Sequence, residues 1–189
     1  TAVEGARQPQ APTWQAHEHR HGTAPAVTNL GRVVHQLVEA GGHEVVELDL
    51  ADGPPPCEDD RLRYVKVDLD DPDTIEAAVL NAPDIVIDDA THAAHHQQNA
   101  FRALFPKMAS GGLYVVEDLR SSPKTLEKQG FVKTSTLFQG YLEHGIFDHP
   151  DDEIKDDMNA LRADISGCFV FPAGFVRGRR DQLLVVHKR

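Results

Sequence analysis

Short apolar segments that alternate with amphipathic helical segments constrain the fold of this chain more than any other feature. Residues 84–88 are nearly continuous in apolar side chains, which is typical of a strand buried on both faces. Residues 30–38 and 101–108 instead carry apolar side chains at helical spacing. Such alternation predicts an α/β fold with a mostly parallel sheet.

The remaining elements follow the same alternation. Asp71 and Pro72 are an N-cap and a first-turn proline, and they predict a helix that runs through about Asn81. Ser110-Gly111-Gly112 predicts a chain break after the helix of residues 101–108. Two late strand segments with no helix between them predict an antiparallel C-terminal hairpin at the sheet edge. Further strands are expected over residues 43–50, 63–67, 113–116, 168–176 and 182–187, and further helices over 124–129 and around Ile154, Met158 and Leu161.

The chain has the length of one domain, with 189 residues. Residues 1–29 hold several prolines and little apolar periodicity, so we expect an irregular N-terminal segment there and the folded domain over residues 30–189. His17, His19 and His21 alternate in that segment, where a solvated stretch is favoured over a metal site.

The net charge, the apolar runs and the cysteine content restrict the partners and the compartment that we expect for this chain. A net charge of −11 argues against binding to nucleic acid or to an anionic membrane surface. The longest apolar runs are too short to span a membrane, and the N-terminus shows no signal pattern. Only Cys57 and Cys168 are present, which fits a reducing cytoplasm. We therefore expect a cytoplasmic protein with a small-molecule partner, and a homo-oligomer remains open.

Acidic residues follow two of the predicted strands. Asp89 comes after residues 84–88, and Glu117 and Asp118 come after residues 113–116. If these strands are neighbours, their ends lie roughly 5 Å apart. Three carboxylates that close repel one another unless a cation lies between them, and Mg²⁺ suits such oxygen ligands. Each residue alone is better explained as a helix N-cap, whereas the set of three favours a metal site.

His92 lies three residues after Asp89, at the start of the next helix. An imidazole there can accept a proton from a hydroxyl beside the metal. His95 and His96 are interpreted as polar residues at a helix start with no role. Asp49 ends a second strand, where an acidic residue commonly binds a ribose, and Asp68 could meet a base amino group.

Two stretches, residues 84–92 and 101–119, resemble a known family. They read Asp-Ile-Val-Ile-Asp-Asp-Ala-Thr-His and Phe-Arg-Ala-Leu-Phe-Pro followed by Gly-Gly-Leu-Tyr-Val-Val-Glu-Asp-Leu. The chain resembles the S-adenosylmethionine- and magnesium-dependent O-methyltransferases of antibiotic biosynthesis, the macrocin and mycinamicin sugar methyltransferase group. The resemblance covers about residues 44–120. Ala90-Thr91 replaces the family's Gly-Ser, Ser110 replaces a proline, and the family's glycine-rich first loop is not found.

The resemblance implies a Rossmann-like class I methyltransferase sheet, with helices on both faces, that transfers a methyl group to a hydroxyl of a sugar or polyol. It also implies the role of each site residue. His92 is the general base, and Asp49, Asp68 and Asp88 face the ribose, adenine and methionine parts of S-adenosylmethionine. Asp89, Glu117 and Asp118 are the Mg²⁺ ligands.

Two alternatives stay open at this stage. Residues 30–49 are similar to the opening of NAD-dependent sugar-nucleotide epimerases and reductases, but the glycine pattern and the Tyr-x-x-x-Lys pair of those enzymes are missing. A non-catalytic binding protein on the methyltransferase fold is the other alternative, and the missing glycine-rich loop supports it.

Overall fold

The computed structural model describes residues 45–48, 62–65, 69–78, 82–119, 125–126, 128–171, 174–176 and 179–189. The predicted N-terminal segment, the predicted helix over residues 30–38 and the two residues Asp49 and Asp68 lie outside this part of the chain.

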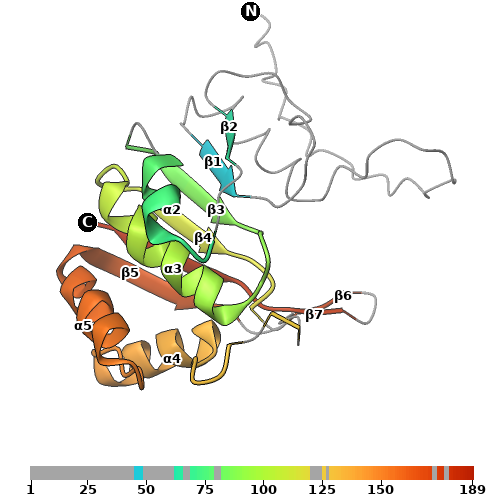
Figure 1. The fold of residues 1–189 in the computed structure, drawn as a ribbon, viewed down its shortest axis with the longest axis vertical. Helices are drawn as coiled ribbons and strands as arrows, with labels where there is room; N and C mark the ends of the chain where they lie inside the picture. The colour runs from blue at the N-terminus through green and yellow to red at the C-terminus, as the bar shows by residue number, and fades with distance from the viewer. Residues whose placement is uncertain are drawn as a thin grey trace, which may run out of the picture.

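A mixed six-stranded sheet forms the centre of the structure (Figure 1), in the order β2-β1-β3-β4-β8-β5. The first four of these strands run parallel, while β8 is antiparallel to both β4 and β5. The predicted α/β class is therefore confirmed, and the late strands pair antiparallel as predicted. The six strands are β1 Val45–Leu48, β2 Leu62–Val65, β3 Ile85–Asp88, β4 Leu113–Val116, β5 Ile165–Val170 and β8 Leu184–Lys188.

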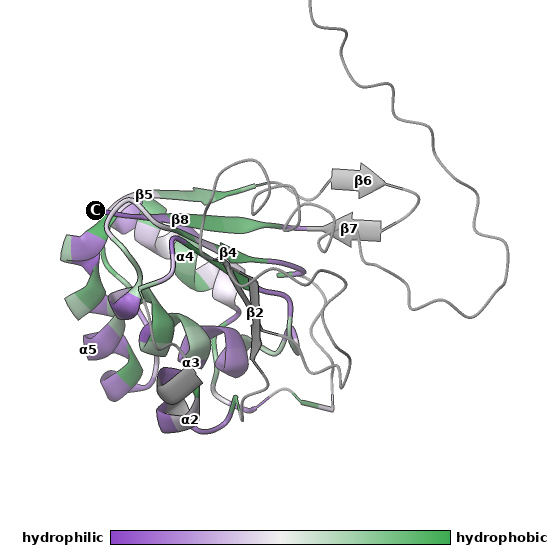
Figure 2. Cartoon of the chain, turned by 90° about the horizontal axis from the view of Figure 1, so that it is seen from above, coloured by the Kyte–Doolittle hydropathy of each residue, from purple (hydrophilic) through white to green (hydrophobic). Residues whose placement is uncertain are grey.

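The described helices gather on one side of this sheet (Figure 2). In the described part of the chain, no helix combines the length and the apolar composition needed to cross a membrane. Helices on the second face stay a prediction. The elements beside the sheet are α2 Pro72–Ala78, α3 Ala94–Leu104, α4 Thr134–His144, α5 Asp152–Ala160, and a small hairpin of β6 Gly174–Val176 with β7 Arg179–Asp181.

The core lies between the sheet and α3. Tyr114 on β4 is fully buried, and its ring meets the Phe101 ring edge to face at 5.1 Å. Phe101 also stacks on Phe105 at 4.7 Å and meets Phe138 of α4 at 5.2 Å. Each such aromatic pair contributes about 0.5–1.5 kcal/mol beyond the area that it buries. The four apolar residues of the predicted stripe are all buried, namely Phe101, Leu104, Phe105 and Met108.

The predicted break between α3 and β4 is confirmed, and glycine is required there for two reasons. Gly111 has a φ of 83°, which side chains rarely tolerate. At Gly112, a Cβ atom would lie 2.8 Å from the carbonyl oxygen of Asp84 and 2.9 Å from that of Ala109. The close approach of these backbones lets β4 enter the sheet directly beside β3.

Side-chain caps begin two helices where the sequence indicates them. Asp71 Oδ1 accepts a hydrogen bond from the backbone N–H of Asp73 at 3.0 Å, as predicted for the start of α2. Asp151 Oδ1 accepts from the N–H groups of Glu153 and Ile154 at the start of α5. Each cap satisfies donors that the first helical turn leaves unpaired.

The predicted helix over residues 124–129 is wrong. Its described residues form turns, and Gly130 follows with a φ of 89°, a left-handed conformation that interrupts a helix. The helix in this region is α4, which begins at Thr134 and was not predicted.

Candidate active site at the carboxyl edge of the sheet

Strands β3 and β4 are parallel neighbours, with Asp88 opposite Val116, so the condition on which the predicted metal site depends is met. The ladder continues one step beyond them, since the Glu117 N–H donates to the Asp88 carbonyl oxygen at 3.0 Å. The two segments that leave these strands therefore start side by side at the carboxyl edge of the sheet. This edge is where open α/β sheets bind ligands.

Three of the predicted site residues meet at this edge. Asp89, His92 and Asp118 each place one donor atom within 4.8 Å of the others, and we call this group the edge cluster. His92 Nδ1 lies 4.0 Å from Asp89 Oδ1, and His92 Nε2 lies 3.8 Å from Asp118 Oδ2. Their side chains are 22%, 22% and 39% exposed for His92, Asp89 and Asp118, so a ligand can reach them from solvent.

The backbone at the edge cluster is unusual. His92 has a φ of 59° and Asp118 a φ of 49°, and no other non-glycine residue in the described part has a positive φ. Left-handed backbone costs a side-chain-bearing residue about 1–2 kcal/mol, and such residues concentrate at functional sites. Both residues with left-handed backbone are therefore members of the edge cluster.

The donor set fits a hard divalent cation. The two carboxylates offer the oxygen ligands that Mg²⁺ prefers, and water or substrate oxygens can complete the coordination shell. His92 Nδ1 is buried and has no hydrogen-bond partner among the described residues, although Asp89 Oδ1 lies 4.0 Å away.

Two other predicted residues lie next to the edge cluster. Glu117 precedes Asp118, but its carboxylate is not part of the group of three, so its role as a metal ligand stays a prediction. Asp88 ends β3 and is only 3% exposed. Its Oδ1 accepts from the Ala90 N–H at 3.4 Å, while its Oδ2 is buried without a hydrogen-bond partner. Burial raises the pKa of the Asp88 carboxyl to about 6.

Three consecutive amide side chains on α3 brace the loops at this edge, and sequence reasoning missed them. Gln97 Nε2 donates to the Glu117 carbonyl oxygen at 3.3 Å. Gln98 Nε2 donates to the Val132 carbonyl at 2.7 Å, and Asn99 Nδ2 to the Leu69 carbonyl at 3.1 Å. The run Gln-Gln-Asn at a helix start was the available signal, because buried amides need partners.

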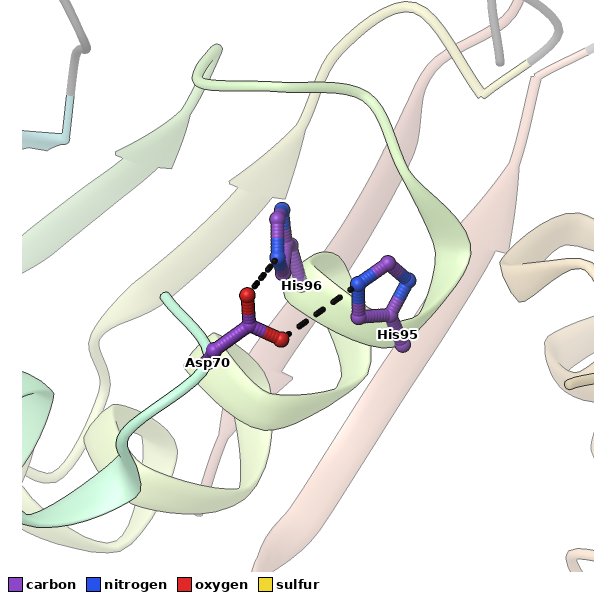
Figure 3. A group of neighbouring side chains, drawn as sticks. All are labelled: Asp70, His95 and His96. Carbon is purple, nitrogen blue, oxygen red and sulfur yellow. Dashed lines mark ion pairs between the residues drawn. The ribbon is translucent and has the colours of Figure 1, made fainter. Parts of the chain in front are cut away.

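A second group, which we call the histidine cluster, consists of Asp70, His95 and His96 (Figure 3). Both histidines lie at the start of α3, as predicted, and they are only 2% and 8% exposed. Burial lowers the pKa of His95 to about 4, and the charges of His96 and Lys128 act in the same direction. His95 is therefore neutral in the folded protein near pH 7.

The sequence comparisons find similarity to antibiotic-pathway methyltransferases. A stretch of 36 residues, 19% of this chain, is 67% identical to a tetracenomycin-C rhamnosyl 3'-O-methyltransferase of Streptomyces olivaceus, of which it covers 9%. A stretch of 65 residues, 33% of this chain, is 46% identical to demethylmacrocin O-methyltransferase of Streptomyces fradiae and covers 16% of it. Mycinamicin VI 2''-O-methyltransferase of Micromonospora griseorubida is 41% identical over 61 residues, which are 31% of this chain and 15% of that enzyme. No family model matches the chain.

The structural comparison finds a solved methyltransferase with a similar fold. MycE, a methyltransferase of the mycinamycin biosynthetic pathway solved with Mg, S-adenosylhomocysteine and mycinamycin VI, superposes with a TM-score of 0.52. The match is 19% identical and covers 89% of this chain but only 50% of MycE.

These matches confirm the predicted resemblance. The chain has an α/β fold with a mixed sheet, similar in structure to a methyltransferase. Within the matched stretches it is a partial homologue of the macrocin and mycinamicin sugar O-methyltransferases. It spans about half the length of MycE, and the matched stretches cover 9–17% of the curated relatives named above and of a second tetracenomycin methyltransferase.

Proposed function

We propose that this chain is the catalytic part of an S-adenosylmethionine-dependent, metal-assisted O-methyltransferase with a Rossmann-like class I sheet. Its substrate is a hydroxyl on a sugar of a glycosylated secondary metabolite. The observation that carries this proposal is the convergence of Asp89, His92 and Asp118 at the carboxyl edge of β3 and β4. The partial homology to sugar O-methyltransferases supports the choice of substrate class.

Each residue of the edge cluster has a proposed task. Asp89 and Asp118, together with Glu117, hold Mg²⁺ through carboxylate oxygens. Bound Mg²⁺ supplies Lewis-acid chemistry, which lowers the pKa of a substrate hydroxyl. His92 accepts the proton of that hydroxyl, as a general base does. The left-handed backbone at His92 and Asp118 holds the base and the carboxylate in place, so the acceleration comes mainly from positioning.

Asp88, Asp49 and Asp68 are the proposed contacts to S-adenosylmethionine, which supplies the methyl group. The buried and unpartnered Oδ2 of Asp88 supports a contact to the amino group of the methionine part, because a buried acceptor without a donor costs free energy. Asp49 and Asp68 are proposed from their positions after predicted strands and from the family resemblance.

Calorimetry with Mg²⁺ and S-adenosylmethionine tests this proposal. We expect both to bind, and we expect Asp89→Ala to abolish the Mg²⁺ signal. Asp156→Ala is the matched control, since it removes an exposed carboxylate on α5 away from the edge cluster. If wild-type protein binds neither ligand, the proposed activity is wrong.

One observation favours the non-catalytic alternative. In the usual order of a dinucleotide-binding sheet, a first strand with a glycine-rich loop lies between the strands that correspond here to β1 and β3. In this structure β1 pairs directly with β3, with Val45 opposite Ile85. Binding of Mg²⁺ without any binding of S-adenosylmethionine would select this alternative.

A further inference from the structure

We propose that the histidine cluster is a second metal site, separate from the edge cluster, that binds a borderline transition-metal dication such as Zn²⁺ through Asp70, His95 and His96. This site goes beyond the proposed methyl transfer and does not depend on it.

The three residues place donor atoms within 4.8 Å of one another, and each imidazole lies close to one oxygen of the Asp70 carboxylate at about the spacing that zinc requires. His96 Nε2 lies 3.4 Å from Asp70 Oδ2, and His95 Nε2 lies 3.6 Å from Asp70 Oδ1. Zinc bonds of about 2.0–2.2 Å in a tetrahedron place neighbouring ligand atoms roughly 3.4 Å apart. Figure 3 shows the Asp70 carboxylate reaching both rings. One ion can therefore contact all three side chains with small adjustments.

His96 provides an independent sign that a ligand is missing. The residue is 8% exposed, and its Nε2 atom is buried without a hydrogen-bond partner while it faces Asp70. The 3.4 Å contact to Asp70 Oδ2 is an ion pair that is longer than the usual range of a hydrogen bond. A metal ion between the two atoms would give this buried nitrogen a short bond.

The other nitrogen of His96 has a partner that suits a metal-binding imidazole when Nδ1 carries the ring proton. Nδ1 lies 2.6 Å from the Thr91 hydroxyl, which fixes the orientation of the ring. A second hydrogen bond, from the Ala93 N–H to Thr91 Oγ1 at 3.3 Å, fixes the threonine. Ligating histidines almost always have such a partner on the second nitrogen.

The segment that carries Asp70 is held against α3 by the Asn99 hydrogen bond to the Leu69 carbonyl. His95 is further held by the Phe131 ring, whose centroid lies 5.5 Å from that of the imidazole. The ligands from both segments are therefore positioned before an ion arrives, which favours binding.

Two imidazoles and one carboxylate select against Mg²⁺, which binds oxygen ligands and keeps much of its water. Imidazole nitrogen suits Zn²⁺ and neighbouring transition metals. The two clusters therefore differ in the ions that they select.

Lys128 competes with the proposed ion. Its Nζ lies 2.5 Å from Asp70 Oδ1, and both side chains are 53% exposed. An exposed ion pair of this kind contributes little to stability, so an ion can displace the lysine. Removing the lysine charge should therefore tighten metal binding. If the ion pair is purely structural, its removal should not change metal affinity.

The test uses the full chain with His17, His19 and His21 replaced by alanine, so that these three imidazoles do not bind zinc. Zn²⁺ is titrated by calorimetry in the presence of saturating Mg²⁺. We expect one zinc equivalent and at least a ~100-fold loss of affinity in His95→Ala/His96→Ala. The matched control His92→Ala should keep that affinity. Equal zinc binding in the double variant, or loss in His92→Ala alone, overturns the proposal.

Two variants that leave the buried imidazoles in place keep the test valid if the double variant fails to fold. Thr91→Val removes the group that orients His96, and we expect a 10–100-fold weaker zinc affinity. Lys128→Met should bind zinc more tightly than the parent. Unchanged affinity in both variants overturns the proposal.

Discussion

The edge cluster and the histidine cluster each take two of their three residues from one short segment, residues 89–96. The two clusters nevertheless differ in ligand type, in exposure and in backbone conformation. The edge cluster has two carboxylates to one imidazole, is partly exposed and stands on left-handed backbone. The histidine cluster has two buried imidazoles in the first turn of a regular helix and one exposed carboxylate. The proposed catalytic group is thus the one that solvent can reach and that stands on left-handed backbone, whereas the regular helix carries the buried group.

The largest expected difference between the clusters is in catalysis. His92→Ala should lower methyl transfer about 10²–10⁴-fold, because the reaction loses its general base. Mg²⁺ affinity, measured by calorimetry, should be nearly unchanged. His144→Ala, an exposed histidine on α4, serves as the control and should keep full turnover. Unchanged turnover in His92→Ala removes this residue from the mechanism.

The second prediction concerns α3, which supports both clusters. Phe101→Ala should destabilise the protein by about 3–5 kcal/mol, because it leaves a cavity among Tyr114, Phe105 and Phe138. The urea midpoint measures this change. Phe169→Ala, at a side chain with 57% exposure, is the control and should change stability by less than about 0.5 kcal/mol. Equal effects at both positions would show that α3 does not hold the core.

The third prediction is a pH dependence that belongs to the histidine cluster. His95 has a pKa of about 4 in the folded protein against 6.5 for a free side chain, so the unfolded chain binds the extra proton first as the pH falls. Its contribution to stability should therefore decrease between about pH 6.5 and 4. Asp88, whose pKa is raised from 3.8 to about 6, acts in the opposite direction over a similar range.

Comparison with His95→Gln isolates the histidine, because Asp88 is present in both proteins. The stability difference between wild type and variant, from urea unfolding at each pH, should shift in favour of the variant as the pH falls from 6.5. A difference that stays constant with pH would show that His95 is not held neutral.

The smallest expected effect has opposite signs in the two clusters. At His92, with a φ of 59°, glycine should be more stable than alanine by about 1 kcal/mol. At His95, within α3, glycine should be less stable than alanine by about 1 kcal/mol. Chemical unfolding of the four variants measures both differences. The same sign at both positions would mean that the edge cluster stores no backbone strain.

The sheet and the edge cluster were largely predictable from the sequence. The apolar run of residues 84–88 indicates a buried central strand, and the acidic residues after two neighbouring strands had to meet at one edge. That Asp118, and not Glu117, joins Asp89 and His92 in the edge cluster could not be predicted in this way. Asp118 has a positive φ, and such a backbone conformation leaves no pattern in the sequence.

The burial of His95 and His96 and the position of helix α4 could not be predicted from the sequence, for a different reason. His95 and His96 are polar in any local pattern, and their partner Asp70 is distant in sequence, so only the packing of α2 against α3 reveals their burial. Helix α4 has Gly140 in its interior, which lowers helix propensity, and its buried residues Leu137 and Phe138 form a narrow apolar stripe.

The position of β8 has a consequence for how the chain folds. Residues 184–188 insert between β4 and β5. The β4–β8 ladder can therefore form only when the segment between residues 116 and 184 closes into a loop. Among the described strands, β5 pairs only with β8. Such long-range pairing makes folding slow, because the chain loses loop entropy before it gains contacts. Until that ladder forms, β4 presents an open strand edge to which a neighbouring nascent chain can add, and this makes aggregation during synthesis a hazard of this topology.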